Sequence, residues 1–172
     1  MHRIISAFHA LLLLPLFANV STADDRILPQ GFRADEVVVH KARRELQLLK
    51  GTDTIKTYRI SLGKNPIGPK IREGDGRTPE GIYRIDWRNS RSTFHLSLHI
   101  SYPDSSDVAR AKQLGLPPGG MIMIHGLTNS LGWIGKLHLL SDWTDGCIAV
   151  TNPEIEELWR CIPDGTTIIL LP

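Results

Sequence analysis

Short apolar segments separated by turn-forming residues fill the chain from residue 36 onward, and they constrain the fold more than any other feature. Each segment is rich in Val, Ile, Leu or Tyr and is too short for a buried helix, which is typical of β-strands. The segments lie at 37–39, 45–49, 54–62, 82–85, 94–98, 121–124, 147–150 and 166–171. We therefore predict a mainly β fold with small helices, arranged as a β-sandwich or a mixed sheet.

Two helices are predicted among these strands. The clearer one begins at residues 152–154, where Asn is a good N-cap, Pro fits the first turn and Glu favours the helix dipole. Ile155, Leu158 and Trp159 would give this C-terminal helix one apolar face. A shorter helix is expected over residues 106–114.

Residues 63–81 contain too many glycines and prolines for a regular element. The segment also carries the basic side chains of Lys64, Lys70, Arg72 and Arg77. We predict a surface loop here. Its length and basic character favour a loop that flanks a substrate.

The first 23 residues have the pattern of an export signal. A short basic start precedes the mostly apolar run 4–17, and residues 21–23 fit a small-x-small cleavage site. The run is shorter than the roughly 20 apolar residues that a membrane helix needs, and Pro15 lies inside it. An uncleaved N-terminal anchor is the alternative interpretation.

Cleavage after Ala23 would leave a chain of ordinary single-domain size. We expect residues 24–35 to be a lead-in and residues 36–172 to form one catalytic domain. The export signal places this domain in the periplasm or cell envelope, with no stable membrane span once the signal is cleaved.

The charge of the chain is nearly balanced. It carries 20 Lys and Arg against 18 Asp and Glu, a formal net charge of +2 at pH 7. The basic residues are scattered rather than clustered, so the sequence excludes nucleic acid as a partner.

Cys147 and Cys161 are the two cysteines of the chain. In an exported protein such a pair permits a disulfide, although a domain of this size folds on its core without one. A zinc site built from the cysteines with His125 and His138 is a further alternative, but no CxxC or HxxxH spacing supports it. We expect no metal, and we interpret Cys161 as buried and inert.

Cys147 and His125 form the candidate catalytic pair. A thiol attacks as the thiolate and needs a base, and histidine titrates near neutral pH. Cys147 follows Gly146, so no bulky neighbour shields its sulfur, and Gly126 lets the chain turn away after His125. The main-chain N–H groups of Thr144 and Gly146 are candidates to face a developing oxyanion. A pair with such donors performs acyl transfer.

Other side chains are candidates for contacts with a substrate. Trp133 and Trp143 flank the loop between the histidine and the cysteine and are candidates for the cleft wall, or for structural packing. His138 lies in the same loop, and we interpret it either as a substrate contact or as a solvated side chain. His95 and His99 share one face of a strand, where they either line a cleft, bind a metal or are half-exposed.

Four pieces of the sequence resemble the L,D-transpeptidase catalytic domain of the YkuD type. They are His125-Gly126, then Thr144-Asp145-Gly146-Cys147-Ile148, then Asn152, with Gly74-Asp75-Gly76-Arg77-Thr78-Pro79-Glu80-Gly81 upstream. The Ser/Thr-x-Gly-Cys piece alone is weakly specific, but the pieces in this order are strongly specific. The resemblance covers roughly residues 36–171.

The resemblance implies an exported, mainly β domain that acts on peptidoglycan stem peptides. Cys147 would attack the carbonyl of the diamino acid at stem position three, His125 would be the base, and Gly146 and Cys147 would form the oxyanion turn. The terminal D-alanine would leave and a thioester would form. An amine of a neighbouring stem, or of a wall-anchored protein, would then accept the acyl group. No metal or cofactor is implied.

Two residues depart from the family pattern. Asp145 stands where members often carry His, and Ala149 stands where they often carry Arg. If the Asp145 carboxylate points at the thiol, it raises the pKa of Cys147. The alternatives are that it points outward, pairs with a basic residue or binds an ammonium group of the substrate. Loss of the Arg removes a carboxylate clamp. A hydrolase that uses water as acceptor, such as an L,D-carboxypeptidase, is therefore an alternative.

Two further classes of protein are alternatives. A non-catalytic wall-binding module with a degenerate site would fit Asp145 and Ala149, but Cys147 and His125 oppose it. A papain-like peptidase would carry its cysteine before its histidine, usually at a helix start, and here the order is reversed.

Overall fold

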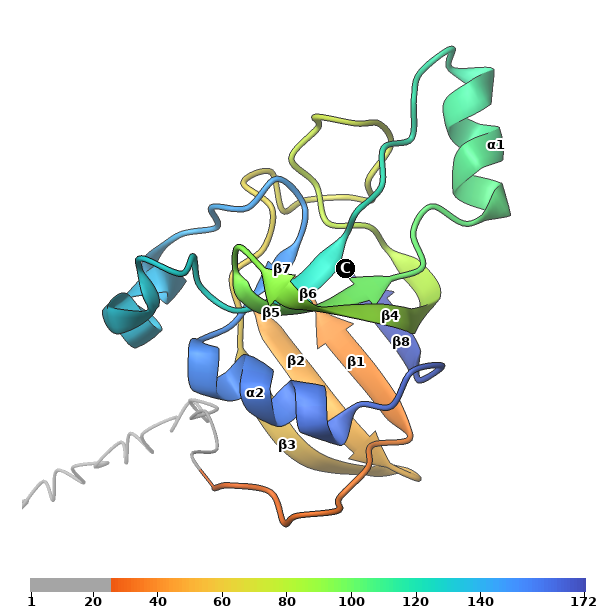
Figure 1. The fold of residues 1–172 in the computed structure, drawn as a ribbon. Coiled ribbons are helices and arrows are strands. Elements are labelled where there is room, and N and C mark those ends of the chain that lie inside the picture. Colours follow the sequence, from red (N-terminus) through yellow and green to blue (C-terminus); the bar gives the residue numbers. More distant parts are fainter. Residues whose placement is uncertain (1–25) are drawn as a thin grey trace, which may run out of the picture.

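The computed structural model describes residues 26–172, in which eight strands form one mixed sheet in the order β3-β2-β1-β8-β4-β5-β6-β7 (Figure 1). The strands are β1 Glu36–His40, β2 Glu45–Lys50, β3 Asp53–Arg59, β4 Gly81–Ser92, β5 His95–Ile100, β6 Met123–His125, β7 Ile148–Ala149 and β8 Thr167–Leu171. The pairs β1–β8 and β6–β7 are parallel, and the other neighbours are antiparallel. The prediction of a mainly β mixed sheet with few helices is confirmed.

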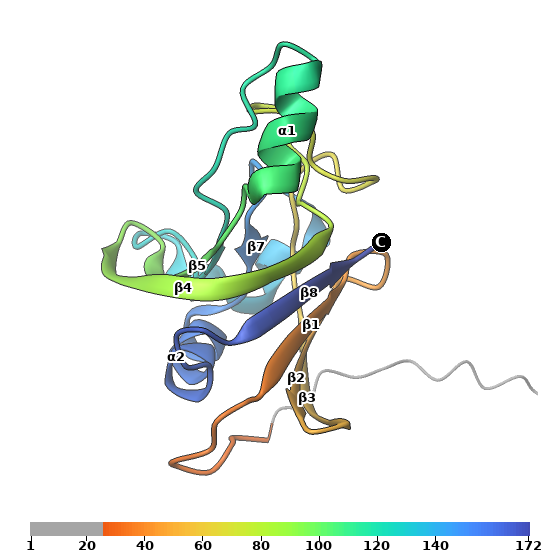
Figure 2. The same ribbon diagram turned by 90° about the vertical axis from the view of Figure 1, so that its right-hand side faces the viewer.

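Strand β4 joins the two halves of the sheet. Its first part, Gly81–Arg84, pairs with β8, and its later part pairs with β5 through Ile85 and Ser92. Irregular register in this second part lets the strand curve, so that the halves face different directions (Figure 2). The sequence predicted only residues 82–85 of this strand, because its later residues are polar and exposed.

The two ends of the sheet meet at residues that follow β3. Ser61 forms an antiparallel bridge with Ala149 of β7, and Gly63 forms a parallel bridge with Thr144. The main chains of Ser61 and Ala149 exchange two hydrogen bonds, of 3.0 and 2.9 Å. This closure sets the start of the glycine-rich loop against the turn that carries Cys147.

Helix α2, Asn152–Cys161, packs against β5 with Ile155, Leu158 and Cys161 buried (Figure 1). The predicted cap is off by one residue. Thr151 is the N-cap, and its N–H and hydroxyl both donate to the Glu154 carboxylate, at 2.8 and 2.7 Å. Asn152 is therefore inside the helix, and its side chain is free to serve another purpose.

The connections between strands hold two further helices. Helix α1, Ser105–Gln113, matches the predicted helix to within a residue and projects from the sheet (Figures 1 and 2). The segment predicted as a loop before Cys147 contains η1, Gly132–Leu140, which consists of two short 3-10 turns separated by a kink at Gly135. The glycine-rich segment 63–81 carries no helix and no strand before β4, as predicted.

The lead-in before β1 is tied to α2. The N–H of Leu28 donates to the buried carboxylate of Glu157 at 2.7 Å, and Arg160 donates to the oxygens of Pro29 and Leu28. The predicted signal, residues 1–23, lies outside the described residues. No helix within residues 26–172 is long and apolar enough to cross a membrane.

Candidate active site

Strands β6 and β7 bring His125 and Cys147 to one face of the sheet. His125 ends β6 and pairs with Ala149 of β7. Cys147 lies two residues before Ala149, and residues two apart on a strand project to the same face. The sheet thus joins two residues that are 22 positions apart in the sequence.

Both side chains line a cavity of about 270 Å³. Aromatic, methionine and small polar side chains complete its wall. These residues are Ser92, Phe94, Ser97, Met121, Met123, Trp143, Thr144 and Asp145. Trp143 therefore lies at the cavity.

The imidazole of His125 is held in one orientation. Its Nδ1 is 2.7 Å from the Gly126 oxygen, so this nitrogen carries the hydrogen and Nε2 is the acceptor in the neutral ring. The ring lies 4.5 Å from that of Phe94 and 5.7 Å from that of Trp143, between centroids. Burial lowers the pKa of His125. The hydrogen bond to Gly126 acts in the opposite direction, but the effect of burial is larger. The geometry therefore leaves a neutral imidazole with one free basic nitrogen.

The thiol of Cys147 contacts the main chain of the segment that leads into β6. Its sulfur accepts from the Met123 N–H at 3.4 Å and donates to the Met121 oxygen at 3.5 Å. Burial raises the pKa of Cys147; the Met123 N–H and Lys70 lower it, and Asp145 raises it. Together with the lowered pKa of His125, this favours a neutral thiol beside a neutral imidazole.

The turn before Cys147 corrects the prediction of its oxyanion donors. The Thr144 N–H already donates to Leu62 O at 3.1 Å, and the Gly146 N–H donates to the Thr144 hydroxyl at 3.1 Å. The same hydroxyl donates to Cys147 O at 2.8 Å, which closes the turn. Among residues 26–172 no hydrogen-bond partner is found for the Cys147 N–H, which makes it a candidate donor to an oxyanion.

The glycine-rich loop supports this turn from behind. Gly146 has φ +133°, and a Cβ there would lie 2.6 Å from Arg77 O. Likewise a Cβ at Gly63 would lie 2.2 Å from Gly76 O and 3.0 Å from the Gly146 Cα. Glycine is required at 63 and 146 because the two segments pack backbone against backbone.

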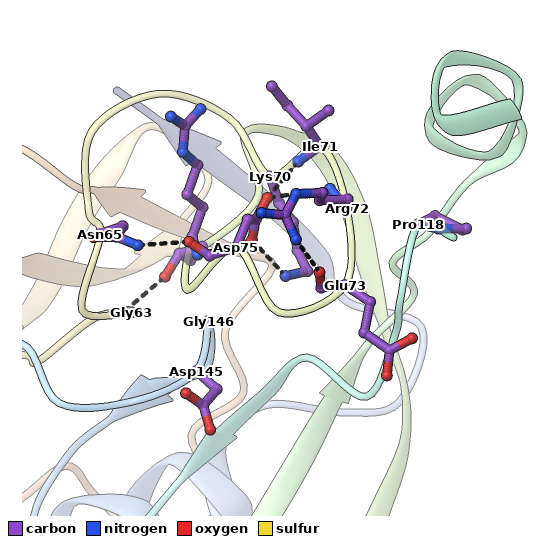
Figure 3. Close-up of polar contacts among 12 residues, drawn as sticks. Gly63, Asn65, Lys70, Ile71, Arg72, Glu73, Asp75, Pro118, Asp145 and Gly146 are labelled. Carbon is purple, nitrogen blue, oxygen red and sulfur yellow. Dashed lines mark hydrogen bonds and ion pairs between the residues drawn. The ribbon is translucent and has the colours of Figure 1, made fainter. Parts of the chain in front are cut away.

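Asp75 organises the glycine-rich loop (Figure 3). Its carboxylate accepts from Lys70 Nζ at 2.8 Å and from the N–H groups of Ile71, Arg72 and Arg77 at 2.8 to 3.1 Å. Burial would raise the pKa of Asp75, but Lys70 and these N–H groups together lower it to about 2. The loop predicted to flank a substrate thus has a folded, charge-paired interior.

The L,D-transpeptidase catalytic domain model matches residues 34–170, most of the chain. The chain belongs to this family. The resemblance seen in the motifs is thereby confirmed.

Individual relatives agree with the family. A putative L,D-transpeptidase, YafK of Escherichia coli K12, is 27% identical over 110 residues, which are 63% of this chain and 37% of that protein. The structure of Bd1075 from Bdellovibrio bacteriovorus matches with TM-score 0.55 and 26% identity, over 83% of this chain and 49% of that one. The K307A mutant of Pgp2, a helical cell shape determining protein of Campylobacter jejuni, has the same fold, with TM-score 0.60 and 22% identity. The match covers 84% of this chain and 49% of that one. The chain spans half or less of each relative's length.

The two departures from the L,D-transpeptidase pattern have different environments. The Asp145 carboxylate points away from the Asp75 cluster (Figure 3). It pairs with Lys64, with 2.7 Å from Oδ1 to Nζ. Of the interpretations open for Asp145, pairing with a basic residue is the one seen here. Ala149 is fully buried, so its position offers no side chain to a substrate.

Asn152 has a role that its motif position did not reveal. Its Oδ1 accepts from the Leu127 N–H at 2.8 Å, close to where a Cβ at Gly126 would lie. A Cβ at Gly132 would lie 2.6 Å from its Nδ2. Asn152 therefore fixes the chain immediately after His125 to helix α2, and the missing Cβ atoms at 126 and 132 make room for it.

Other predicted candidates lie away from the cavity. Trp133 is 79% exposed on η1 and does not line it. His95 contacts Glu156, and His99 contacts Asp86 and stacks on Trp87. The position of His138 in a loop suggested a solvated side chain, but His138 is buried. Its Nδ1 lies 3.2 Å from the Ser61 hydroxyl.

The two cysteines are both free, so the alternative of a Cys147–Cys161 disulfide is wrong. Cys161 is fully buried on α2. Among residues 26–172 no group of three His, Cys, Asp or Glu side chains is placed to hold a metal ion.

Proposed function

We propose that this domain is a cysteine acyltransferase that acts on peptidoglycan stem peptides. The observation that carries the proposal is the shared cavity of Cys147 and His125, in which the orientation of the imidazole leaves Nε2 as a base. Membership of the L,D-transpeptidase family supplies the substrate class.

In the first step the thiol proton moves to His125 Nε2 as the sulfur attacks the carbonyl carbon of the third stem residue. The oxyanion of the tetrahedral intermediate is stabilised by the Cys147 N–H. The bond to the terminal D-alanine breaks, and the proton on His125 goes to its departing amine. A thioester on Cys147 remains.

In the second step an amine attacks the thioester carbonyl and gives its proton to His125. The bond to sulfur breaks, the thiol regains the proton, and a new amide is released. The amine would belong to a neighbouring stem or to a wall-anchored protein. Export to the periplasm or cell envelope through residues 1–23 would bring the enzyme to these partners.

Water as the acceptor is the second candidate, which would make the protein an L,D-carboxypeptidase or a cross-link hydrolase. The observation that favours it is Ala149, whose small buried side chain leaves no cation at that position to hold an acceptor's carboxylate.

Incubation of the purified protein with tetrapeptide-bearing muropeptides, followed by mass spectrometry, tests both candidates. Dimers bonded between third residues indicate transpeptidation, and tripeptides alone indicate hydrolysis. Cys147→Ala and His125→Ala should each abolish the activity. If no product forms and Cys147 carries no acyl adduct, the catalytic proposal is wrong and a wall-binding module is the better description.

A further inference from the structure

A second pocket, of about 380 Å³, shares the wall residue Trp143 with the cavity of Cys147. It lies between η1 and the segment that follows His125. Its other lining residues are mostly apolar, namely Leu127, Thr128, Leu131, Ile134, Leu137, His138 and Ser141. A group that enters this pocket therefore lies next to the reactive site and in mainly apolar surroundings.

Two side-chain nitrogens of the lining residues are buried and unpaired. Among residues 26–172 no hydrogen-bond partner is found for His138 Nε2 or for Trp143 Nε1, and the His138 side chain is only 5% exposed. A buried polar atom without a partner is costly, and most such atoms in proteins are bonded to protein, water or a ligand. A ligand that bonds to both nitrogens would remove this cost.

The contacts of His138 decide which of its nitrogens carries the hydrogen. The Ser61 hydroxyl donates to the main-chain oxygen of His138 at 3.0 Å, so toward Nδ1, 3.2 Å away, it accepts. Nδ1 therefore carries the hydrogen, and Nε2 is an acceptor. Burial lowers the pKa of His138 to about 4, with a further contribution from His125, so the ring is neutral at pH 7. The indole nitrogen of Trp143 is a donor only.

One acceptor and one donor in an uncharged pocket favour a neutral ligand. A carboxylate would face the lone pair of His138 Nε2, an ammonium group would face the N–H of Trp143, and no lining residue offers an opposite charge. A secondary amide supplies one N–H and one oxygen, and a methyl group beside it would suit the apolar wall. The acetamido group of an amino sugar has all three parts.

We propose that this pocket binds an acetamido group of the glycan to which the stem peptide is attached. The amide N–H donates to His138 Nε2, the amide oxygen accepts from Trp143 Nε1, and the methyl group packs against the leucine and isoleucine side chains. The inference rests on the proposed function and deepens it, because it adds the sugar to the substrate of Cys147. Two stem residues, which span about 7 Å when extended, separate the attacked residue from the sugar, so the two sites should be close but distinct.

Entry of the ligand requires a small movement of η1, because neither nitrogen is open to solvent. The kink of η1 lies at Gly135, which has φ 49° and no atom within 4 Å of the position of a Cβ. The side chains of Trp133, Leu137 and Leu140 are 79%, 62% and 85% exposed. The segment therefore gives up little buried apolar area when it moves.

Three probes test the inference by calorimetry on the Cys147→Ala variant, which binds without acyl transfer. The first is the N-acetylglucosaminyl-N-acetylmuramyl tetrapeptide. The second carries hydroxyl groups in place of both acetamido groups, and the third is the tetrapeptide with an acetylated N-terminus and no sugar. We expect the first probe to bind about tenfold more tightly than either of the others, because two hydrogen bonds and a buried methyl group are at stake.

Two results with these probes would overturn the inference. Equal binding of the first and second probes would mean that the acetamido groups are not recognised. If the third probe binds as tightly as the first, the pocket recognises an amide of the peptide rather than one of the sugar.

His138→Asn, added to Cys147→Ala, tests the acceptor nitrogen. Asparagine keeps an N–H for the Ser61 hydroxyl but has no atom at the position of Nε2, so the tenfold preference should fall below about threefold. His99→Asn is the matched control, because His99 is also buried and bonds through Nδ1, to Asp86 at 2.6 Å, but does not line the pocket. It should keep the preference. A preference that survives His138→Asn unchanged would contradict the proposed contact.

The indole N–H of Trp143 gives a second readout that needs no substitution in the pocket. In a two-dimensional N–H correlation spectrum of Cys147→Ala protein, the first probe should move this signal further downfield than the second probe does. The signal of Trp87, which stacks on His99 away from the pocket, should stay in place. Equal positions of the Trp143 signal with both probes would mean that water, and not the sugar, pairs with the indole.

These measurements separate the pocket from the proposed function. A preference for the acetamido sugar that depends on His138 supports the pocket even if no turnover of muropeptides is found. Equal binding of the first two probes rejects the pocket even if wild-type protein acylates Cys147 and the proposed function stands.

Discussion

The thiol of Cys147 donates to the main-chain oxygen of Met121, at 3.5 Å. Met121 adopts φ 57°, which is unusual for a residue other than glycine. The thiol therefore rests on a strained segment that leads into β6, and it lines the same cavity as the imidazole of His125. Strain of this kind is often concentrated at functional sites.

Alkylation of Cys147 should lack the low-pH plateau of a thiolate–imidazolium pair. Burial raises the pKa of Cys147 above its usual 9.0 and lowers that of His125 below 6.5. The neutral forms of both groups therefore predominate near pH 7, and the rate with iodoacetamide should keep rising through pH 9. A plateau between pH 6 and 7 would contradict the neutral pair. Rates measured on Cys147→Ala correct for reaction at Cys161.

Substitutions of Met121 should separate backbone strain from side-chain contact. Met121→Gly removes the left-handed penalty but adds freedom to the unfolded chain, so the free energy of unfolding should change by less than about 0.5 kcal/mol. Met121→Val places a β-branched residue at the same φ and should cost about 1–2 kcal/mol. Denaturant unfolding measures both. Equal stabilities of the two variants would show that position 121 is not strained.

The positions of most strands were readable from sequence because each segment is short, apolar and bounded by turn residues. The later half of β4 was not, since its residues are mostly polar and partly or fully exposed, although they pair with the mostly buried strand β5. Nor was the closure of the sheet at Ser61 and Gly63, because isolated bridges between distant segments leave no pattern in the sequence.

Asn152→Ala should impair activity more than its effect on stability explains. It leaves the buried Leu127 N–H without its acceptor, which should cost about 2 kcal/mol, and it loosens the chain beside His125. Thr151→Ala is the matched control, because it removes a helix cap worth about 1 kcal/mol without touching Gly126. Turnover per folded molecule should fall in Asn152→Ala and hold in Thr151→Ala. A parallel loss in both variants would mean that Asn152 acts through helix stability alone.

Gly146→Ala should damage the nucleophile turn. The new Cβ would lie 2.6 Å from Arg77 O at φ +133°, so the turn and the glycine-rich loop must separate. We expect a loss of about 2–4 kcal/mol and a large fall in Cys147 reactivity. Gly51→Ala is the control, with φ +58° and no atom within 4 Å of the Cβ, and should cost about 1 kcal/mol. Similar losses in both variants would show that the contact with Arg77 is not tight.

The meeting of His125 and Cys147 at one cavity was predictable, because each lies beside a glycine in a recognisable motif. The availability of donors was not, since the bonds of Thr144 and Gly146 depend on Leu62 and on the turn's own hydroxyl. Lys64 was missed as the partner of Asp145 because only the closed sheet brings the two together. Contacts between distant segments account for these differences.

Asp75 should make the domain sensitive to acid between pH 4 and pH 2. Its pKa falls to about 2 from 3.8 because bonds from Lys70, Ile71, Arg77 and Arg72 outweigh burial. A lowered carboxyl pKa adds stability that is fully present above pH 3.8 and is lost as the pH falls toward 2, here about 2 kcal/mol.

Asp75→Asn tests this assignment by denaturant unfolding at pH 7, 4 and 2. At pH 7 the variant should lose about 3 kcal/mol, because Lys70 is only 3% exposed and would be left without its counter-charge. The difference from wild type should shrink between pH 4 and pH 2, as the wild-type carboxylate gains its proton. Asp35→Asn, which changes an exposed carboxylate bonded to Lys50, should show little difference at any pH. A wild-type advantage over Asp75→Asn that stays constant down to pH 2 would mean that Asp75 does not hold its charge in the loop.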